Sequence, residues 1–191
     1  MQLSSKEEQR YGRNKETVIN RAYIESGEYR KKFDRISNNA ELNKLLYQLA
    51  KKMLLHRSGT LYEDMYWIDP DVLCVVASEI NCDMEQRIVY SHATIKAIRG
   101  KKGLLTIHSH PNSFPPSLAD FNSNYEHHNG IGIVCGHDGS VYVYRAEEEI
   151  KQQDWTVEYH ANYKRYKNER DAQEQVWRNL LEKYNAYLKE M

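Results

Sequence analysis

The chain has 191 residues, which fits one domain of ordinary size with room for appended helices. Its 27 basic and 27 acidic residues balance to a net charge of zero, so no overall field attracts nucleic acid or an anionic membrane. A mean hydropathy of −0.82 argues against an integral membrane protein, and 15 Tyr with 3 Trp are too many aromatic residues for a disordered chain.

The cysteines and the first residues indicate the compartment. Cys74, Cys82 and Cys135 are odd in number and show no CxxC spacing, so we expect neither a disulfide framework nor a thiolate zinc site. The first residues contain no apolar h-region of a signal peptide, and no run approaches the ~20 apolar residues of a membrane span. We therefore expect a soluble, cytoplasmic protein with no membrane partner.

Helical patterns come first along the chain. Residues 1–40 are charged and rich in tyrosine, with apolar positions too sparse for an independent core; they predict one or two helices packed on the rest, or an arm for a partner. The next stretch predicts an amphipathic helix that ends near Gly59, after the basic last turn of His56 and Arg57. Its apolar residues recur at i, i+3, i+4 and i+7: Leu42, Leu45, Leu46, Leu49, Met53 and Leu54.

Two strand-like runs follow, at residues 61–69 and 72–80, separated by the turn signal Asp69-Pro70-Asp71. The second run is rich in Val and Ile and is apolar on both faces up to Ala77. This composition predicts a central strand that is covered on both sides.

The middle of the chain alternates between the two patterns. The predicted elements are helix 91–99, strand 103–110, helix 118–128 and hairpin 131–145. Ser91 can cap the first of these helices, and the turn of the hairpin is expected at 137–139.

The end of the chain is again helical in pattern. We expect residues 147–191 to form a C-terminal helical extension that includes one long terminal helix. Its apolar stripe consists of Val176, Leu180, Leu181, Tyr184, Tyr187 and Leu188. The predicted fold class is α+β, with a core at 41–146 between the two helical extensions.

Two histidines close the predicted strand 103–110. Side chains alternate along a strand, so His108 and His110 point to the same side, about 7 Å apart at ~3.3 Å rise per residue. They can converge on one ion if the strand end curls. A helix that starts near Leu118 would place Asp120 in its first turn, aimed back toward the strand end. Two imidazoles and a carboxylate, with a fourth position open to water, are typical of catalytic zinc.

The same residues also allow a purely structural interpretation. Ser117 follows two prolines and could be only the N-cap of a helix, with Asp120 stabilised by the helix dipole. A histidine pair near a strand end is, taken alone, more often a polar edge than a ligand set. The joint presence of HxHP, SxxD and a strand-to-helix junction favours the metal interpretation.

The stretch HSHPNSFPPSLAD, residues 108–120, resembles the signature of the JAMM (also called JAB or MPN) zinc metalloproteases: HxHP, a short spacer, then SxxD. The element order of 41–146 is similar as well, which implies the family's mixed, cytidine-deaminase-like sheet flanked by helices. The compact core and proline-rich spacer look most like prokaryotic or phage-borne JAB domains. One departure is that six residues separate His110 from Ser117 where the usual pattern has seven. Because the deletion falls in a loop, we expect it to be tolerated.

The resemblance implies roles for single residues. His108, His110 and Asp120 would hold a Zn2+ cofactor, and Ser117 would hydrogen-bond the water or the developing oxyanion. The family also uses an upstream glutamate that holds the water and shuttles its proton.

Two glutamates compete for this role of general base. Glu63 fits best because it opens the predicted strand 61–69, and Glu79, near the end of the next strand, is the rival. Asp64 would face the opposite side of the strand from Glu63, so it is the poorer candidate.

Other residues carry weaker assignments. Asn112 and Phe114 lie in the loop between the ligands, where they could contact substrate. Trp67 shares a strand face with Glu63 and could line the cleft, although a core position is the safer interpretation. Cys135 lies in an apolar run and is expected in the core.

Three functions follow from these observations. The first is a zinc metalloprotease or isopeptidase that cleaves a protein or peptide substrate and could remove a ubiquitin-like modifier. The second is a non-catalytic scaffold or assembly module of the same fold, in a phage or DNA-repair setting. The third is a DNA-associated role like that of related RadC-type domains, which the zero net charge and the lack of a basic stripe disfavour.

Overall fold

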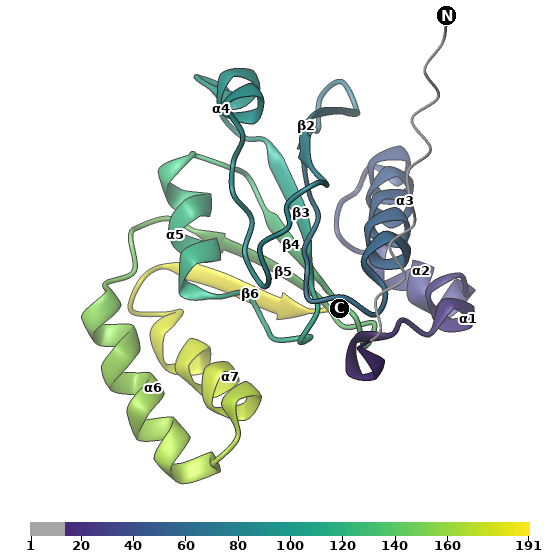
Figure 1. Ribbon diagram of the computed structural model, residues 1–191. Coiled ribbons are helices and arrows are strands. Elements are labelled where there is room, and N and C mark those ends of the chain that lie inside the picture. Colours follow the sequence, from purple (N-terminus) through teal and green to yellow (C-terminus); the bar gives the residue numbers. More distant parts are fainter. Residues whose placement is uncertain (1–13) are drawn as a thin grey trace, which may run out of the picture.

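The computed structural model describes residues 14–191 and shows an α+β fold, in which a six-stranded mixed sheet lies between two groups of helices (Figure 1). The helices are η1 Lys15–Thr17, α1 Arg21–Ile24, α2 Gly27–Phe33, α3 Ala40–Arg57, α4 His92–Ile98, α5 Leu118–Glu126, α6 Gln152–Tyr166 and α7 Glu169–Leu180. The strands are β1 Met65–Asp69, β2 Cys74–Glu79, β3 Leu105–His110, β4 Gly132–Gly136, β5 Val141–Ala146 and β6 Ala186–Glu190. Their order is β2-β1-β3-β4-β5-β6, and β3 and β4 form the one parallel pair among these strands.

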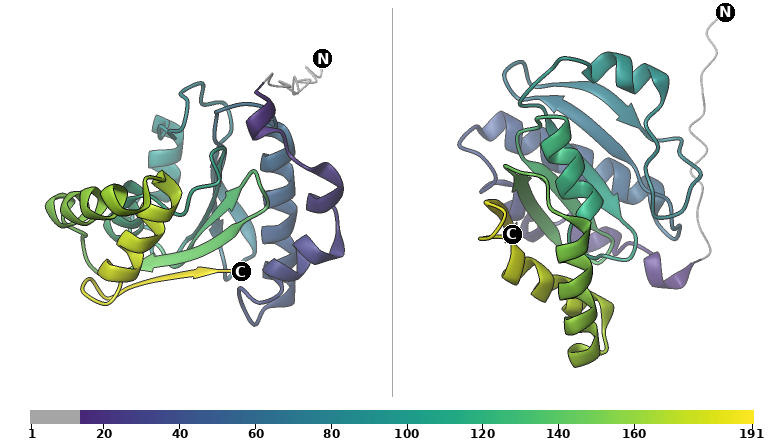
Figure 2. Two further views of the ribbon diagram at one scale, coloured as in Figure 1. Left: turned by 90° about the horizontal axis from the view of Figure 1, so that it is seen from below. Right: turned by 90° about the vertical axis from the view of Figure 1, so that its left-hand side faces the viewer.

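The two faces of the sheet are covered by different helices. Figures 1 and 2 show α1, α2 and α3 on one face and α4, α5 and α7 on the other. Alternation along β3 sends Leu105 and Ile107 into the core beneath α3, whereas His108 and His110 point to the α5 face. The α5 face also receives Val134 of β4, in a core with α5 and α7. One face of β3 therefore contributes to the hydrophobic core beneath α3, and the other presents the two histidines to α5.

Helix α3 is the predicted amphipathic helix, and it anchors the first layer. Asn39 caps its start by accepting from two backbone amides. Leu46, Met53 and Leu54 are fully buried, and each such side chain contributes about 1.5–3 kcal/mol to stability. Within the predicted extension 1–40, the described part packs on α3 through α1 and α2, while residues 1–13 lie outside the described residues.

One strand prediction is wrong in its place in the sheet. β2 pairs with β1 alone and is an edge strand, and Val75 is 40% exposed. The central strands are instead β3 and β4, which are buried at every position. Val and Ile suit any pleated strand, so their abundance in 72–80 indicated a strand without indicating its neighbours.

The prediction of one long terminal helix is also wrong. After α6 and α7 the chain turns at Asn185, whose φ is 43°, and β6 pairs antiparallel with β5. Tyr187 and Leu188, which were expected to extend the helical stripe, therefore lie in a strand. Pairing with β5, about 40 residues upstream, overrides a periodicity that a helix would also satisfy.

The other predicted elements are confirmed with shifted ends, the largest in the predicted strand 61–69, where β1 begins only at Met65 and Glu63 precedes it. Ser91 caps α4, Ser117 caps α5, and the hairpin of β4 and β5 turns through His137, Asp138 and Gly139. Cys135 is fully buried, and all three cysteines are free. Within residues 14–191, no helix is long and apolar enough to cross a membrane.

Candidate metal centre

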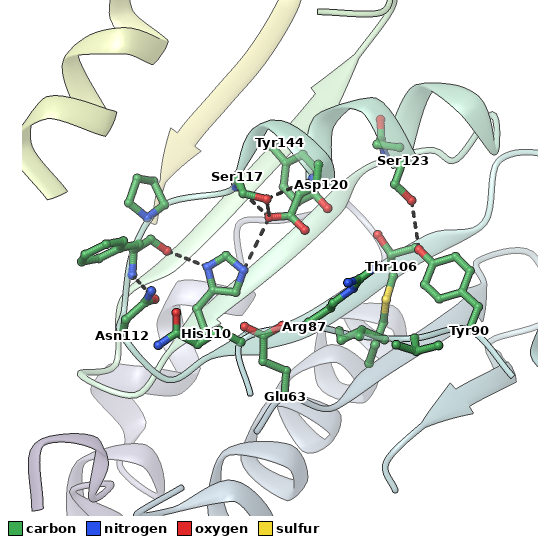
Figure 3. A pocket seen from close by; sticks show the side chains of 18 of the residues that line it. Glu63, Arg87, Tyr90, Thr106, His110, Asn112, Ser117, Asp120, Ser123 and Tyr144 are labelled. Atoms are coloured by element: carbon green, nitrogen blue, oxygen red, sulfur yellow. Dashed lines mark hydrogen bonds and ion pairs between the residues drawn. The ribbon is translucent and has the colours of Figure 1, made fainter. Parts of the chain in front are cut away.

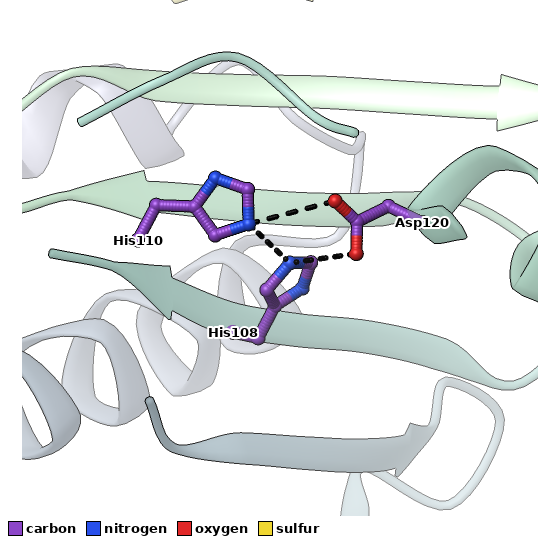
Figure 4. A group of neighbouring side chains, drawn as sticks. All are labelled: His108, His110 and Asp120. Atoms are coloured by element: carbon purple, nitrogen blue, oxygen red, sulfur yellow. Dashed lines mark hydrogen bonds and ion pairs between the residues drawn. The ribbon is translucent and has the colours of Figure 1, made fainter. Parts of the chain in front are cut away.

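His108, His110 and Asp120 converge on one point between β3 and the first turn of α5 (Figure 4). The Nε2 atoms of the two imidazoles are 3.1 Å apart. The Oδ1 atom of Asp120 lies 3.3 Å from His108 Nε2, and its Oδ2 atom lies 3.5 Å from His110 Nε2. Ligand atoms placed ~2.0–2.1 Å from a tetrahedral ion are themselves about 3.3 Å apart. The three side chains therefore fit a single metal ion with little rearrangement.

The start of α5 fixes the carboxylate. The Ser117 amide donates to Asp120 Oδ2 at 2.6 Å, and the Ser117 hydroxyl donates to the same oxygen at 2.7 Å. In return the Asp120 amide donates to Ser117 Oγ at 3.2 Å, which completes a capping box. Ser117 is therefore the N-cap of α5, and the same hydrogen bonds direct the Asp120 carboxylate at the histidines. The helix-cap and the metal-ligand interpretations of this stretch are compatible.

A loop carbonyl fixes the orientation of His110. Its Nδ1 atom lies 2.9 Å from the Phe114 carbonyl, which can only accept, so Nδ1 carries a proton and, when the ring is neutral, Nε2 is the lone-pair atom that faces the cluster. Asn112 Oδ1 in turn accepts from the Phe114 amide. Asn112 and Phe114 line the cavity as expected, and Phe114 has this second role that the sequence did not reveal. His108 differs, because its Nδ1 is buried and has no hydrogen-bond partner.

The charges of Asp120 and His110 shift each other's pKa values. Burial alone would raise the pKa of Asp120, but His108 and His110 hold it well below the usual range. Burial alone would lower the pKa of His110, but the hydrogen bond to Asp120 and the charges of Glu63 and Asp120 raise it to about 9. The site therefore favours a positive charge at its centre, which a metal ion can supply.

Glu63 lies in the same cavity. Met65 is opposite His108 in the antiparallel β1–β3 pair, and hydrogen bonds between Asp64 and Ser109 extend the pairing by one residue. This register sets Glu63 beside His110. Burial raises the pKa of Glu63, although both histidines of the cluster act to lower it.

The rival glutamate lies elsewhere. Glu79 is not among the residues that line the cavity; its Oε1 accepts from the Ser91 amide at 2.7 Å, at the start of α4. Burial alone would raise its pKa, but hydrogen bonds from Thr94 and Ser91 lower it. Asp64 points to the opposite face, where it binds Arg57. Of the three carboxylates considered, the structure brings Glu63 into the cavity of the candidate metal ligands.

The cavity has a volume of about 580 Å³ and extends to both sides of His110 and Asp120 (Figure 3). Asn112 and Phe114 lie at one end, and Tyr90, whose hydroxyl bonds Ser123, lies at the other. Lining residues that the sequence did not single out include Arg87, Tyr90, Thr106, Ser123, Asn129, Tyr144 and Gln173. They come from separate segments of the chain, so no local pattern marks them.

Two aromatic residues shape the walls. Trp67, considered as a cleft residue, is fully buried and does not line the cavity; it packs against Tyr90, which does, with ring centroids 4.9 Å apart. Tyr144 lies across Gly132, where a Cβ atom would come within 2.2 Å of the Tyr144 ring. A glycine at this position of β4 is therefore needed for the tyrosine to line the site beside His108.

Comparisons of the chain with protein-family models, with curated proteins and with solved structures gave no match.

Proposed function

We propose that this protein is a zinc-dependent hydrolase of the JAMM type that cleaves a peptide or isopeptide bond in a protein or peptide substrate. The observation that carries the proposal is the convergence of His108, His110 and Asp120 in a cavity that also contains Glu63. The signature HSHPNSFPPSLAD and the mixed sheet flanked by helices support the same family.

Zinc is the metal that best suits this donor set. Two imidazole nitrogens and one carboxylate, with space for a further ligand, are typical of catalytic zinc sites. A bound zinc ion would lower the pKa of a water molecule to about 7 and polarise a substrate carbonyl. His108, His110 and Asp120 would hold the ion, and the hydrogen bonds to Phe114 and Ser117 would keep two of these side chains in place.

Glu63 acts as the general base and then as the general acid. Its raised pKa brings the carboxylate closer to the working pH, where proton transfer in both directions is efficient. It accepts a proton from the attacking water and returns this proton to the nitrogen of the cleaved bond. Its position beside His110 in the same cavity supports this role.

Ser117 contributes first by holding Asp120. Its hydroxyl proton is directed at the Asp120 carboxylate, so stabilisation of an oxyanion requires this hydroxyl to turn toward the cavity that Ser117 already lines. The backbone amide of Ser117 would then keep Asp120 in place alone.

The shape of the cavity favours a polypeptide substrate. Space on both sides of the cluster accommodates residues before and after the cleaved bond, as an internal peptide bond or an isopeptide bond requires. A protein conjugated to a ubiquitin-like modifier is one candidate, and a peptide cleaved in its interior is another; both place chain on each side of the metal. Action in the cytoplasm is part of the same proposal.

The test combines metal analysis with hydrolysis. Purified protein should contain about one zinc per chain, and it should cleave members of a panel of internal peptides and lysine-conjugated substrates until a chelator is added. Glu63→Gln should retain zinc and lose hydrolysis by a factor of at least ~100. Glu79→Gln, the matched control on the neighbouring strand, should remain active.

Two results would contradict the proposal. Wild-type protein that binds no zinc would leave a non-catalytic scaffold as the better explanation. Activity in Glu63→Gln combined with its loss in Glu79→Gln would show that the base is assigned to the wrong glutamate.

A further inference from the structure

The loop between the two halves of the candidate metal centre is held internally in its first half, where the Ser113 amide donates to the His110 carbonyl and the Phe114 amide to Asn112 Oδ1. Residues 111–116 connect His110 to the Ser117 cap and contain the Phe114 carbonyl that orients His110. Pro115 and Pro116 lie at the end of this loop, and a proline has no N–H group to donate. Their carbonyl oxygens are therefore the backbone groups through which this part of the loop can be held by hydrogen bonds.

Helix α7 supplies the donors for both carbonyls. Gln173 Nε2 donates to the Pro115 carbonyl at 3.3 Å and to the Pro116 carbonyl at 3.2 Å. Trp177 Nε1 donates to the Pro116 carbonyl at 2.8 Å. Both side chains are buried, and they lie one turn apart on the same face of α7. The bonds are therefore shielded from water and come from a single rigid element.

The same helix is fixed to the sheet near the metal centre. Arg170 donates to the Asp138 carboxylate at 2.9 Å and to the Tyr142 hydroxyl at 3.0 Å, at the turn and start of β5. The Trp177 ring packs on Phe121, the residue after Asp120, with centroids 4.2 Å apart. α7 thus contacts the loop before the α5 cap and the helix turn after it.

We propose that α7 is a positioning element of the metal centre. Gln173 and Trp177 hold the two proline carbonyls, and through them they set the Phe114 carbonyl against His110 Nδ1. The bond to Phe114 selects the tautomer of His110 whose Nε2 faces Asp120. This inference rests on the metal site of the proposed function, and it assigns a role to the C-terminal extension.

The test uses zinc alone as the probe, so it does not depend on a substrate. Gln173→Met keeps the length of the side chain and removes both donor contacts, and Trp177→Phe keeps the ring and removes the N–H group. Each should weaken zinc affinity about 10-fold, measured by competition with a chelating indicator. Gln175→Met is the matched control, because Gln175 lies on the same helix, is absent from the hydrogen bonds described for loop 111–116, and donates through its side chain to Asn179 one turn further on.

Two further measurements separate positioning from general stability. Unfolding in EDTA should have a somewhat lower midpoint in Gln173→Met and Trp177→Phe than in Gln175→Met, because each removes a donor from a buried proline carbonyl, and both variants should remain fully folded under the conditions of the zinc titration. Long-range 1H–15N spectra of the zinc-loaded proteins should show the single Nδ1–H tautomer of His110 in wild type and in the control, and an altered ring signature in the other two variants.

Wild-type zinc affinity in both Gln173→Met and Trp177→Phe would overturn the inference while leaving the proposed function in place. So would a loss of affinity that Gln175→Met shares, or one in a variant whose His110 ring signature is that of wild type. Absence of zinc binding in the wild type would overturn the proposed function together with this inference.

Discussion

Two clusters of histidine and aspartate lie on opposite faces of the sheet, and they differ in their source of positive charge. On the α3 face, Asp64 Oδ1 accepts from Arg57 Nε at 2.5 Å, and its Oδ2 lies 2.6 Å from His56 Nδ1. Arg57 also donates to the carbonyls of Ile80 and Cys82. Asp64 and Arg57 are almost fully buried, and the guanidinium is permanently charged. The negative charge of Asp64 is therefore balanced by a side chain of the protein itself.

On the α5 face, Arg87 lines the same cavity, but among residues 14–191 no guanidinium or ammonium group forms an ion pair with Asp120. Asp120 faces the Nε2 atoms of His108 and His110, which also face each other. A charge at the centre must come from a proton on an imidazole or from a metal ion. Histidine and aspartate together therefore do not mark a candidate metal site; what distinguishes this cluster is that its carboxylate faces two imidazoles rather than a guanidinium. The predictions below test this contrast, from the largest expected effect to the smallest.

Asp64→Asn should have the largest effect on folding. It leaves Arg57 buried without its carboxylate, and breaking a buried ion pair in this way costs about 3–5 kcal/mol of unfolding free energy. The loss should appear in urea denaturation both in EDTA and in zinc, and zinc should still stabilise the folded variant. If Asp64→Asn instead abolished zinc binding at unchanged stability in EDTA, the two clusters would not be separate.

Zinc itself should stabilise only through the second cluster. At a free concentration of about 100 times the dissociation constant, a ligand that binds only the folded state adds about 2.7 kcal/mol to the unfolding free energy. We expect this increase in wild type and none in Asp120→Asn, which removes a charged ligand but keeps its shape. Stabilisation of Asp120→Asn by the same amount would indicate that zinc binds elsewhere.

In protein stripped of metal, a proton on His110 should replace the cation. A folded-state pKa of about 9 against ~6.5 in the unfolded chain means that this stabilisation is full below pH 6.5 and is lost as pH rises through 9. Between pH 7 and pH 9 the loss amounts to about 2 kcal/mol. Urea denaturation in EDTA should show this loss of unfolding free energy in wild type and not in His110→Gln. The variant reports the pH dependence that all other titrating groups contribute. An equal fall of the unfolding free energy between pH 7 and pH 9 in saturating zinc would contradict this prediction, because bound zinc should take the place of the proton on His110.

The sequence revealed the second cluster because its information is local. His108, His110, Ser117 and Asp120 fall within thirteen residues, and alternation on a strand followed by a capped helix is enough to bring three of them together. Glu63 could be chosen from outside this stretch only through the family resemblance. Its position beside His110 depends on the register between β1 and β3, which no short pattern specifies.

What the sequence did not reveal depends on contacts between distant segments. The donors of Gln173 and Trp177 reach the loop from about 60 residues away, and their spacing is compatible with any core-facing helix. The C-terminal strand β6 was misassigned for the same reason, since its pairing with β5 is invisible in a stripe of Tyr and Leu. Local patterns thus located the candidate ligands, and the tertiary fold decides which side chains hold them in place.

His56→Ala should have the smallest effect of the four. The sequence suggested only a basic last turn of α3, whereas the structure shows His56 as the second partner of Asp64. Because Arg57 remains bound to the carboxylate, the variant removes one hydrogen bond and should cost about 1 kcal/mol in urea denaturation. Gln48→Ala, an exposed position on the same helix, controls for the change in helix propensity. A loss as large as that of Asp64→Asn would mean that His56, and not Arg57, supplies the charge that completes this cluster.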